Sequence, residues 1–248
     1  MVTTIPGSQR FFAAIDQAAA TALGRTELGT GTLVVPDPQR VGSTSVVCYP
    51  RSGRTIIWTA PEMAERLADL ARSEAMTLEE FQTAAAAVGG ETGGTGTFRL
   101  LSEHPVDPAV LRQSEIRDLR RDQPEDRALI AAFIDVCSAS DLEETELDLD
   151  DLDPHMLAVL DEEGAIAAYA SGRPWGYDAA FDDVGVITRT DRRGHGLGAS
   201  AVAAYTRRCL TAGRIPLYNC NDENIGSARL AEAVGFRAVQ QVAAARFT

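Results

Sequence analysis

The pattern of hydrophobic and polar positions along the chain predicts a mixed α/β protein in two parts. In the first part, apolar residues recur at helical spacing in some segments and form short runs between glycines and prolines in others. The pattern predicts helices over residues 10–23, 61–74 and 77–88, strands over 31–35, 43–49, 54–59 and 97–101, and a glycine-rich turn over 89–96. We therefore expect a small α+β domain at the start of the chain.

Two of these helices carry start signals. Pro61 suits the first turn of a helix, where its missing N–H would have no partner. Thr77 is followed three residues later by Glu80, the spacing of a capping box. No motif with chemical content lies in this part of the chain, so its sequence does not indicate a role.

A polar stretch interrupted by prolines separates the two parts. It lies near residues 103–123 and marks a change in the texture of the chain. From this change we predict an N-terminal accessory domain over residues 1–105, a linker over 106–123 and a second domain over 124–248.

The second part has a more regular order of elements. It predicts a helix, an antiparallel meander and then alternating strands and helices. The expected helices cover residues 125–140, 197–213 and 224–234, and the expected strands cover 155–162, 165–175, 182–190, 215–221 and 236–247. The first two strands meet at Glu163-Gly164, a hairpin turn, and an acidic run over 141–153 precedes them.

Composition and charge narrow the range of partners. The chain has 248 residues, a formal net charge of -13 and a pI of about 4.7, which argues against general attraction to nucleic acid or to an anionic membrane. No signal peptide or membrane span is expected, and alanine and arginine usage suggests a bacterial source. The cysteines have no metal-site spacing, so we expect a cytoplasmic protein with reduced thiols and no metal; they are Cys48, Cys137, Cys209 and Cys220.

One segment is unusual in so acidic a chain. Residues 188–198, TRTDRRGHGLG, contain three arginines and three glycines between a predicted strand and a predicted helix. The first N–H groups of a helix lack internal partners, and the helix dipole favours an anion beside them. Glycines allow close backbone approach, and Arg193 offers a charged donor. The segment therefore predicts a phosphate or pyrophosphate site.

Three ligand classes compete for this site. A P-loop requires Gly-Lys-Ser/Thr where Leu197-Gly198-Ala199 stands, so we reject it. A dinucleotide fingerprint is formally present in Gly194, Gly196 and Ala199, with Asp222 as the acidic residue. Its context does not fit, because an antiparallel meander precedes the loop and too few residues follow. The third class is coenzyme A.

Two motifs favour coenzyme A. Residues 193–198, RGHGLG, resemble the R/Q-x-x-G-x-G/A signature of the GCN5-related N-acetyltransferases (GNAT). Residues 224–236, NIGSARLAEAVGF, resemble the later segment of that family, in which an asparagine opens a helix that ends in Gly-Phe. The resemblance covers roughly residues 112–248. It implies a GNAT-like mixed sheet, flanked by helices, whose two central parallel strands splay apart around acetyl-CoA.

The resemblance also implies roles for individual residues. Backbone groups of Val186, Ile187 and Thr188 would bond the pantetheine, and Asn224 and Ser227 would meet the pantetheine arm or the phosphates. The pyrophosphate would be held by the N–H groups of Arg193, Gly194, His195, Gly196, Leu197, Gly198 and Ala199.

The catalytic groups are less clearly marked. Many family members place a tyrosine, as general acid, where this chain has Ala231, so Tyr218 and Cys220 on the neighbouring strand are the candidates. Asp182 and Asp183 at the start of the third strand are candidates for the general base, with Asp183 preferred. By resemblance, the acidic run borders the acceptor site and would attract a cationic amine.

The resulting hypothesis is an acetyl-CoA-dependent N-acetyltransferase that acts on a small-molecule amine by direct attack on the thioester. The alternative is a non-catalytic acyl-CoA-binding regulatory module, and a dinucleotide-dependent oxidoreductase ranks last. The sequence specifies neither the acceptor nor the acyl chain. It specifies no oligomeric state either and is compatible with a dimer.

Overall fold

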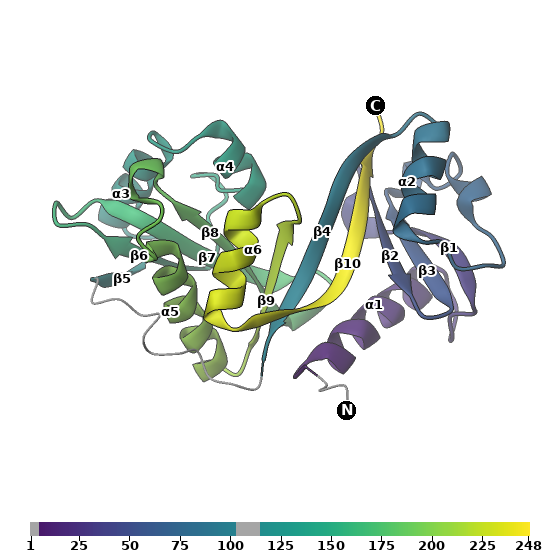
Figure 1. The fold of residues 1–248 in the computed structure, drawn as a ribbon, viewed down its shortest axis with the longest axis horizontal. Helices are drawn as coiled ribbons and strands as arrows, with labels where there is room; N and C mark the ends of the chain where they lie inside the picture. The colour runs from purple at the N-terminus through teal and green to yellow at the C-terminus, as the bar shows by residue number, and fades with distance from the viewer. Residues whose placement is uncertain (1–4, 103–114) are drawn as a thin grey trace. The chain divides into compact units, whose positions relative to one another are not determined.

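A computed structural model describes residues 5–102 and 115–248, and the chain divides into two compact units (Figure 1). The first unit consists of Met1–Arg99, Asn219–Ile225 and Ala238–Thr248, and the second of Leu100–Tyr218 and Gly226–Arg237. Each unit is therefore built from separate stretches of the chain. None of the helices in the described ranges has the length and apolar character that a bilayer-spanning helix needs.

The first unit is an α+β assembly, as its sequence pattern predicts. Its helices are α1 (Ser8–Ala22) and α2 (Leu78–Ala87), and its strands are β1 (Gly31–Pro36), β2 (Ser45–Arg51), β3 (Arg54–Thr59), most of β4 (Glu91–Leu101) and the end of β10 (Phe236–Arg246). β3 pairs with β1 in parallel and with β2 antiparallel. The predicted capping box is confirmed, since Thr77 and Glu80 exchange side-chain and backbone hydrogen bonds at the start of α2.

Two predictions in this unit are wrong. Residues 61–74 form only the short 3-10 turns Pro61–Met63 and Ala68–Leu70, because the following backbone is drawn to β1: Thr32 and Arg72 exchange backbone hydrogen bonds of 2.9 and 3.2 Å. The glycine-rich residues 89–96 are not a turn but contain the start of β4. A Cβ at Gly96 would lie 3.3 Å from the Cys220 carbonyl oxygen, so glycine there allows close packing of backbones.

The second unit contains the remaining elements. They are β5 (Ile116–Leu119), α3 (Pro124–Ile134), α4 (Ala139–Thr145), β6 (His155–Leu160), β7 (Ile166–Trp175), β8 (Asp178–Thr188), α5 (Leu197–Thr211), the first part of β9 (Ile215–Asn221) and most of α6 (Ile225–Val234). The strand order is β5-β6-β7-β8-β9, antiparallel except for the parallel β8–β9 pair. The predicted mixed α/β fold is confirmed.

The two faces of this sheet carry different helices. Ile130 and Phe133 of α3 pack with Tyr169 and Ile187 in one core cluster. On the opposite face, Tyr205 of α5 lies so close to the sheet that a Cβ at residue 172 would be 2.3 Å from its hydroxyl, which accounts for Gly172. Odd-numbered residues of β8 therefore face α3 and α4, and even-numbered residues face α5.

The predicted domain boundaries differ from the two units. Residues 106–114, the first half of the predicted linker, lie outside the described residues. The remainder contains β5, which pairs with β6, so it is not a linker. At the other end, Ala243–Arg246 of β10 pairs with Cys48–Ser45 of β2. The last strand of the chain thus completes the first unit, a long-range pairing that sequence periodicity does not reveal.

Candidate functional site

The candidate site begins where β8 and β9 part. The two strands pair at three positions, from Phe181 opposite Ile215 to Asp183 opposite Leu217. β8 then continues to Thr188, paired with β7 on its other side. The predicted splay between the central parallel strands is therefore present, and it leaves an open edge on the C-terminal half of β8.

The register of β8 decides which backbone groups face this edge. The Arg189 N–H donates to the Ala167 carbonyl at 3.0 Å, so by alternation the backbone groups of odd-numbered residues face β7. Those of Val186 and Thr188 face the open edge, where a ligand can pair with them as a strand would. Ile187 points its backbone groups to β7. Among the three predicted backbone contacts, the geometry favours Val186 and Thr188.

The glycine loop ends at the first turn of α5. Gly194 and Gly196 have φ of 77° and 75°, left-handed values that other residues rarely adopt, and Gly196 is the N-cap of the helix. The Arg193 N–H donates to Thr190 at 3.4 Å. Within the described residues, the backbone N–H groups of residues 194–199 have no backbone acceptor. The loop therefore presents a run of donors to an anion.

Other residues of the loop shape this arrangement. A Cβ at Gly198 would lie 2.5 Å from Thr188 Oγ1 and 2.9 Å from Leu230 Cδ1, so glycine lets α5 pack closely on β8 and α6. The His195 ring turns back on the loop, with Nδ1 2.9 Å from the Arg193 carbonyl oxygen. That His195 contributes its backbone N–H rather than its ring to a ligand remains a prediction.

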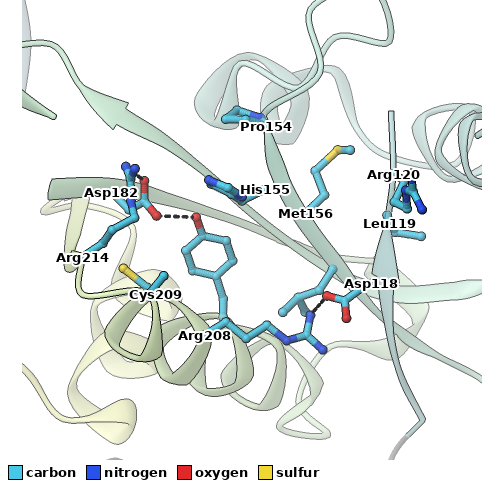
Figure 2. Close-up of a pocket in the computed structure, with 13 residues that line it drawn as sticks. Asp118, Leu119, Arg120, Pro154, His155, Met156, Asp182, Arg208, Cys209 and Arg214 are labelled. Atoms are coloured by element: carbon cyan, nitrogen blue, oxygen red, sulfur yellow. Dashed lines mark hydrogen bonds and ion pairs between the residues drawn. The ribbon is translucent and has the colours of Figure 1, made fainter. Parts of the chain in front are cut away.

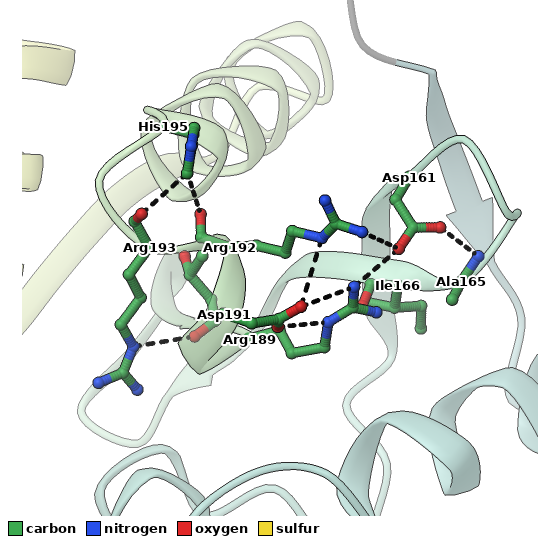
Figure 3. Close-up of polar contacts among 9 residues, drawn as sticks. Asp161, Ala165, Ile166, Arg189, Asp191, Arg192, Arg193 and His195 are labelled. Carbon is green, nitrogen blue, oxygen red and sulfur yellow. Dashed lines mark hydrogen bonds and ion pairs between the residues drawn. The ribbon is translucent and has the colours of Figure 1, made fainter.

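Two arginines of the loop segment, Arg189 and Arg192, are paired with carboxylates (Figure 3). Arg189 and Arg192 both reach Asp161 in the β6–β7 turn, at 2.8 and 3.4 Å. Burial opposes ionisation of Asp161, but hydrogen bonds from the Ala165 N–H and from Arg189 outweigh it and hold the pKa of Asp161 below its ordinary value. These two arginines thus fasten the loop to the sheet.

Arg193 has a different partner. Its Nη2 donates to Asp141 Oδ2 at 2.6 Å, and its Nε donates to the Thr188 carbonyl at 3.1 Å. The sequence predicted a phosphate contact from this guanidinium. The structure uses it to connect the loop with the start of α4, while half of the side chain stays exposed. The backbone N–H groups of residues 194–199, rather than this guanidinium, are therefore the donors left available to an anion.

Asp182 and Asp183 project to opposite faces of the sheet, as neighbours on a strand do. Asp182 is buried on the α5 side, where it accepts a 3.0 Å hydrogen bond from Tyr205 and pairs with Arg214. These contacts give it a structural role. Asp183 lies on the α4 side, at the last β8–β9 pair, and keeps part of its surface exposed. Of the two predicted candidates, only Asp183 is placed to exchange a proton with a ligand.

The surroundings of Asp183 favour a general base. Loss of water around the carboxyl raises the pKa of Asp183 to about 7, and the negative charges of Glu146 and Asp153 add to this shift. Arg173, directly opposite on β7, works against it. A carboxyl with this pKa is half ionised near neutrality, so it can accept a proton and release it again.

Part of the acidic run lies on the same face as Asp183. Thr145 at the end of α4 is 4.0 Å from the position of a Cβ on Gly185, so α4 packs over β8 at this point. Glu146 follows directly, with a left-handed φ of 52°. Asp153 accepts from Arg173 Nε at 2.5 Å, and Asp151 lies 3.6 Å from the same guanidinium. Glu146 and Asp153 therefore lie close enough to Asp183 for their charges to act on its carboxyl.

Tyr218 and Ser227 are brought together. The Tyr218 ring is buried against Phe236, and its hydroxyl lies 2.8 Å from Ser227 Oγ on the first turn of α6. Ala231, at the position of the absent family tyrosine, is one turn further along the helix and is buried. Tyr218 therefore delivers a phenol to the same helix from the neighbouring strand.

Cys220 and Asn224 belong to the first unit. The Cys220 thiol is buried and accepts a hydrogen bond of 3.1 Å from Arg99 Nη1, a setting that favours packing over proton transfer. Asn224 precedes α6, and its backbone N–H donates to Asn221 at 3.0 Å. Both roles remain predictions.

The dinucleotide alternative loses its acidic residue. The Asp222 carboxylate accepts hydrogen bonds from Thr95 and Thr97 hydroxyls at 2.7 and 2.5 Å and from Gln241 at 2.7 Å. These partners occupy the oxygens that a ribose would need. The coenzyme A interpretation does not depend on this residue.

Sequence reasoning missed Arg173 and Asp141. Arg173 joins the acidic residues beside Asp183, and Asp141 anchors Arg193. Arg173 lies opposite Asp183 in the β7–β8 ladder, so a correct register for that hairpin would have identified it. No local signal pairs Asp141 with a residue so distant in the sequence.

Comparison with known proteins agrees with this geometry. Residues 158–244 match the family model described as GNAT acetyltransferase. No curated protein matches the chain at a significant level.

Several solved structures are similar in part. A putative GNAT-family acetyltransferase from Novosphingobium aromaticivorans shares 20% identity over 64% of this chain and 68% of its own, with a TM-score of 0.48. A GCN5-related N-acetyltransferase-like protein from Streptococcus suis shares 19% sequence identity over 99% of this chain and 100% of its own, with a TM-score of 0.46. A putative acetyltransferase from Salmonella typhimurium, solved with its cofactor acetyl-CoA, shares 17% sequence identity over 55% of this chain and 94% of its own. Its TM-score is 0.41.

Because all three TM-scores lie below 0.5, the family assignment rests on the sequence match together with the geometry of β8, the loop and α5. The C-terminal region of the chain belongs to the GNAT acetyltransferase superfamily.

Proposed function

We propose that the protein is an acetyl-CoA-dependent N-acetyltransferase that transfers an acetyl group to the amine of a small molecule. One observation carries the proposal: Asp183, with a pKa of about 7, stands at the point where β8 and β9 part. A carboxyl that titrates near neutrality beside the open edge of β8 suits a general base at neutral pH.

The donor side fits coenzyme A. The free N–H groups of the 194–199 loop suit a pyrophosphate, and the open edge of β8 at Val186 and Thr188 suits the amide groups of pantetheine. Ser227 extends this surface from α6. Acetyl-CoA would supply an acyl group activated as a thioester. The residues of the chain would then orient the thioester and accept and donate the protons of the reaction.

We infer the following division of labour for direct attack. Asp183 accepts the proton of the incoming amine, directly or through one water. The outward N–H of Val186 is available to polarise the thioester carbonyl. Tyr218 is the proton donor for the departing thiolate. It takes the role of the tyrosine that many family members have at the position of Ala231. Alignment of the two substrates between β8 and α4 supplies much of the remaining rate.

The tyrosine assignment predicts a change in turnover rather than in binding. Replacing Tyr218 by phenylalanine keeps the ring that packs on Phe236 and removes the hydroxyl. We expect kcat to fall by about 10²-fold, since a positioned proton donor contributes about 10²–10⁴-fold. Calorimetry should show CoA affinity within about threefold of wild type. The same hydroxyl removal at Tyr49, in the first unit, should leave kcat unchanged; equal kcat in both variants would exclude Tyr218 as the acid.

The acceptor we propose is a cationic amine. Glu146, Asp151, Asp153 and Asp183 surround a single arginine, Arg173, on the α4 side of the sheet. This excess of negative charge would raise the local concentration of a polyamine or aminoglycoside.

Charge removal tests this acceptor class. Changing Glu143, Glu144 and Glu146 to glutamine should lower kcat/KM for a polyamine at low salt, with a smaller effect for a monoamine. Salt should weaken the wild-type preference, because the Debye length falls from about 10 Å at 0.1 M to about 3 Å at 1 M. Glutamine at the exposed residues Glu65, Glu79 and Glu162 makes the same change in net charge and serves as control. Equal losses in both triple variants would show that only net charge matters.

Two assays separate this proposal from its alternatives. Release of free thiol from acetyl-CoA that depends on an added amine distinguishes an enzyme from a non-catalytic binding module. Calorimetry with CoA and with NAD distinguishes both from an oxidoreductase. We expect amine-dependent thiol release and binding of CoA but not of NAD.

A further inference from the structure

Two carboxylates and one arginine lie in a row across three neighbouring strands, on the α4 side of the sheet. Asp153 comes two residues before the start of β6, Arg173 is on β7, and Asp183 is on β8. β7 runs between β6 and β8, and Arg173 is directly opposite Asp183 in the β7–β8 ladder. Residues opposite each other in an antiparallel pair point to the same face, with Cβ atoms about 5 Å apart. The arginine therefore lies between the two carboxylates.

Arg173 is bound to one of these carboxylates and not to the other. Its Nε donates to Asp153 at 2.5 Å, and its Nη1 lies 3.6 Å from Asp151. Among the described residues, Asp183 accepts no hydrogen bond and forms no ion pair. The guanidinium is thus held on the β6 side of β7, and its charge acts on Asp183 through space.

Asp182, the neighbour of Asp183 on β8, has the opposite arrangement. On the other face of the sheet it pairs directly with Arg214 and accepts a hydrogen bond from Tyr205 (Figure 2). A carboxylate held in this way would lose both partners on taking up a proton from a ligand. The oxygens of Asp183 are not occupied by such contacts within the described part of the chain, so they remain available.

Arg173 also opposes the other influences on Asp183. Loss of water around the carboxyl raises the pKa of Asp183. Three negative groups add to the rise, namely Glu146 after α4, Asp153 before β6 and Asp182 on β8 itself. On β9, the residue opposite is the uncharged Leu217. Of the groups that act most strongly on this carboxyl in the described ranges, Arg173 alone is positive, so it is what favours the ionised form.

We propose that Arg173 is a positioning residue for Asp183: Asp153 holds its guanidinium beside Asp183 but out of contact, so that the positive charge stabilises the carboxylate without occupying its oxygens. The inference rests on the proposed function, in which Asp183 is the general base. It adds a division of roles, since Asp153 fixes the arginine and the arginine acts on the base.

Substitution of the two partners should move the pKa of Asp183 in opposite directions. Arg173→Gln removes the positive charge, so this pKa should rise from about 7 to about 8 or higher, because a neighbouring cation lowers a carboxyl pKa by about 1–3. Asp153→Asn removes a negative charge and frees the guanidinium to pair with Asp183, so the pKa should fall to about 6 or lower. Arg173→Lys keeps the charge and should leave the pKa within about 0.5 of wild type.

NMR titration of the full-length protein with ¹³C-labelled aspartate measures this pKa without any substrate, and the Asp183→Asn protein assigns the signal. Arg207→Gln on α5 and Glu162→Gln in the β6–β7 turn make the same changes in net charge at exposed positions. Both controls should leave the pKa of Asp183 unchanged.

The pH profile of acetyl transfer should follow the NMR result. At pH 7, kcat/KM of Arg173→Gln should be about a tenth of its own plateau, where the wild type has about half, and the variant should reach its plateau above about pH 9. The predicted pKa shifts without a matching shift of the kinetic profile would confirm how Arg173 acts on Asp183 and would remove Asp183 as the base of the proposed function.

Three results would overturn the proposal: an unchanged pKa of Asp183 in Arg173→Gln, an equal shift in Arg207→Gln, or shifts in the same direction in Arg173→Gln and Asp153→Asn. If Arg173→Gln does not fold, the other two variants decide. A fall of the pKa in Asp153→Asn together with a wild-type value in Arg173→Lys supports the proposal, and any other combination contradicts it.

Discussion

Replacement of Asp183 by asparagine is expected to lower kcat/KM for the amine at pH 8 by about 10²-fold or more, the usual contribution of a general base. Asparagine keeps the size of the side chain at the last β8–β9 pair but cannot take up a proton. CoA affinity should change little, because the loop proposed to hold the phosphates follows the C-terminal end of β8. Asp182→Asn is not a suitable control, since it would disturb the buried pair with Arg214.

The raised pKa of Asp183 also predicts how kcat/KM changes with pH. The pKa of Asp183 is about 7 in the folded protein and its ordinary value is 3.8. The base is active when ionised, so kcat/KM of the wild type should rise with pH and level off above about 7. The Asn variant should lack this rise. A wild-type profile that is flat between pH 5 and 8 would remove Asp183 from the mechanism.

The contribution of Asp183 to the free energy of unfolding should fall with rising pH, whereas kcat/KM should rise. Between pH 3.8 and about 7 the folded protein keeps a proton on Asp183 that the unfolded chain has already lost. The favourable contribution of this group is therefore complete below pH 3.8 and is lost as pH rises through 7. Denaturant unfolding should show wild type losing free energy of unfolding relative to Asp183→Asn over this interval. This readout does not depend on any substrate.

Replacement of Gly196 by valine is expected to weaken CoA binding by well over tenfold, about 1.4 kcal/mol or more. The position has φ of 75° and caps α5, so a β-branched side chain disturbs the turn that aims the N–H groups at the pyrophosphate. It would also obstruct close approach of the phosphate. Calorimetry with CoA measures the effect.

Backbone strain alone needs a separate control. Gly213, just beyond the other end of α5, has φ of 73°, and a Cβ there would meet nothing within 4 Å. Gly213→Val imposes the same strain on the same helix away from the loop and should leave CoA affinity unchanged. A folded Gly196→Val protein that binds CoA as well as Gly213→Val does would show that the loop is not the phosphate site.

Local signals predicted most of the elements. The capping box at Thr77 and the left-handed glycines at the ends of α5 and α6 are encoded in neighbouring residues, and the structure has helix boundaries at each. The segment over 61–74 has helical spacing, but hydrogen bonds between Thr32 and Arg72 draw the backbone after it to β1. The pairing of β10 with β2 is equally non-local. The sequence pattern therefore predicted a single boundary along the chain and did not assign the last strand to the first unit.

The candidate site shows the same difference between features encoded by neighbouring residues and features that depend on distant ones. The donor loop is contiguous in sequence, and its glycines could be identified from spacing. The surroundings of Asp183 could not, because Arg173, Glu146 and Asp153 come from three different segments whose meeting depends on strand register and on how α4 packs. Sequence indicated which carboxylate to consider, and only the structure shows why its pKa is raised.

The most direct test of acetyl transfer is product detection by mass spectrometry after the full-length protein is incubated with acetyl-CoA and a panel of small amines. The account predicts a mass increase of one acetyl group on at least one cationic amine, formed together with free CoA and reduced about 10²-fold or more in the Asp183→Asn protein. Tight CoA binding without acetylation of any polyamine, aminoglycoside or monoamine in the panel would contradict it and favour a non-catalytic acyl-CoA-binding module.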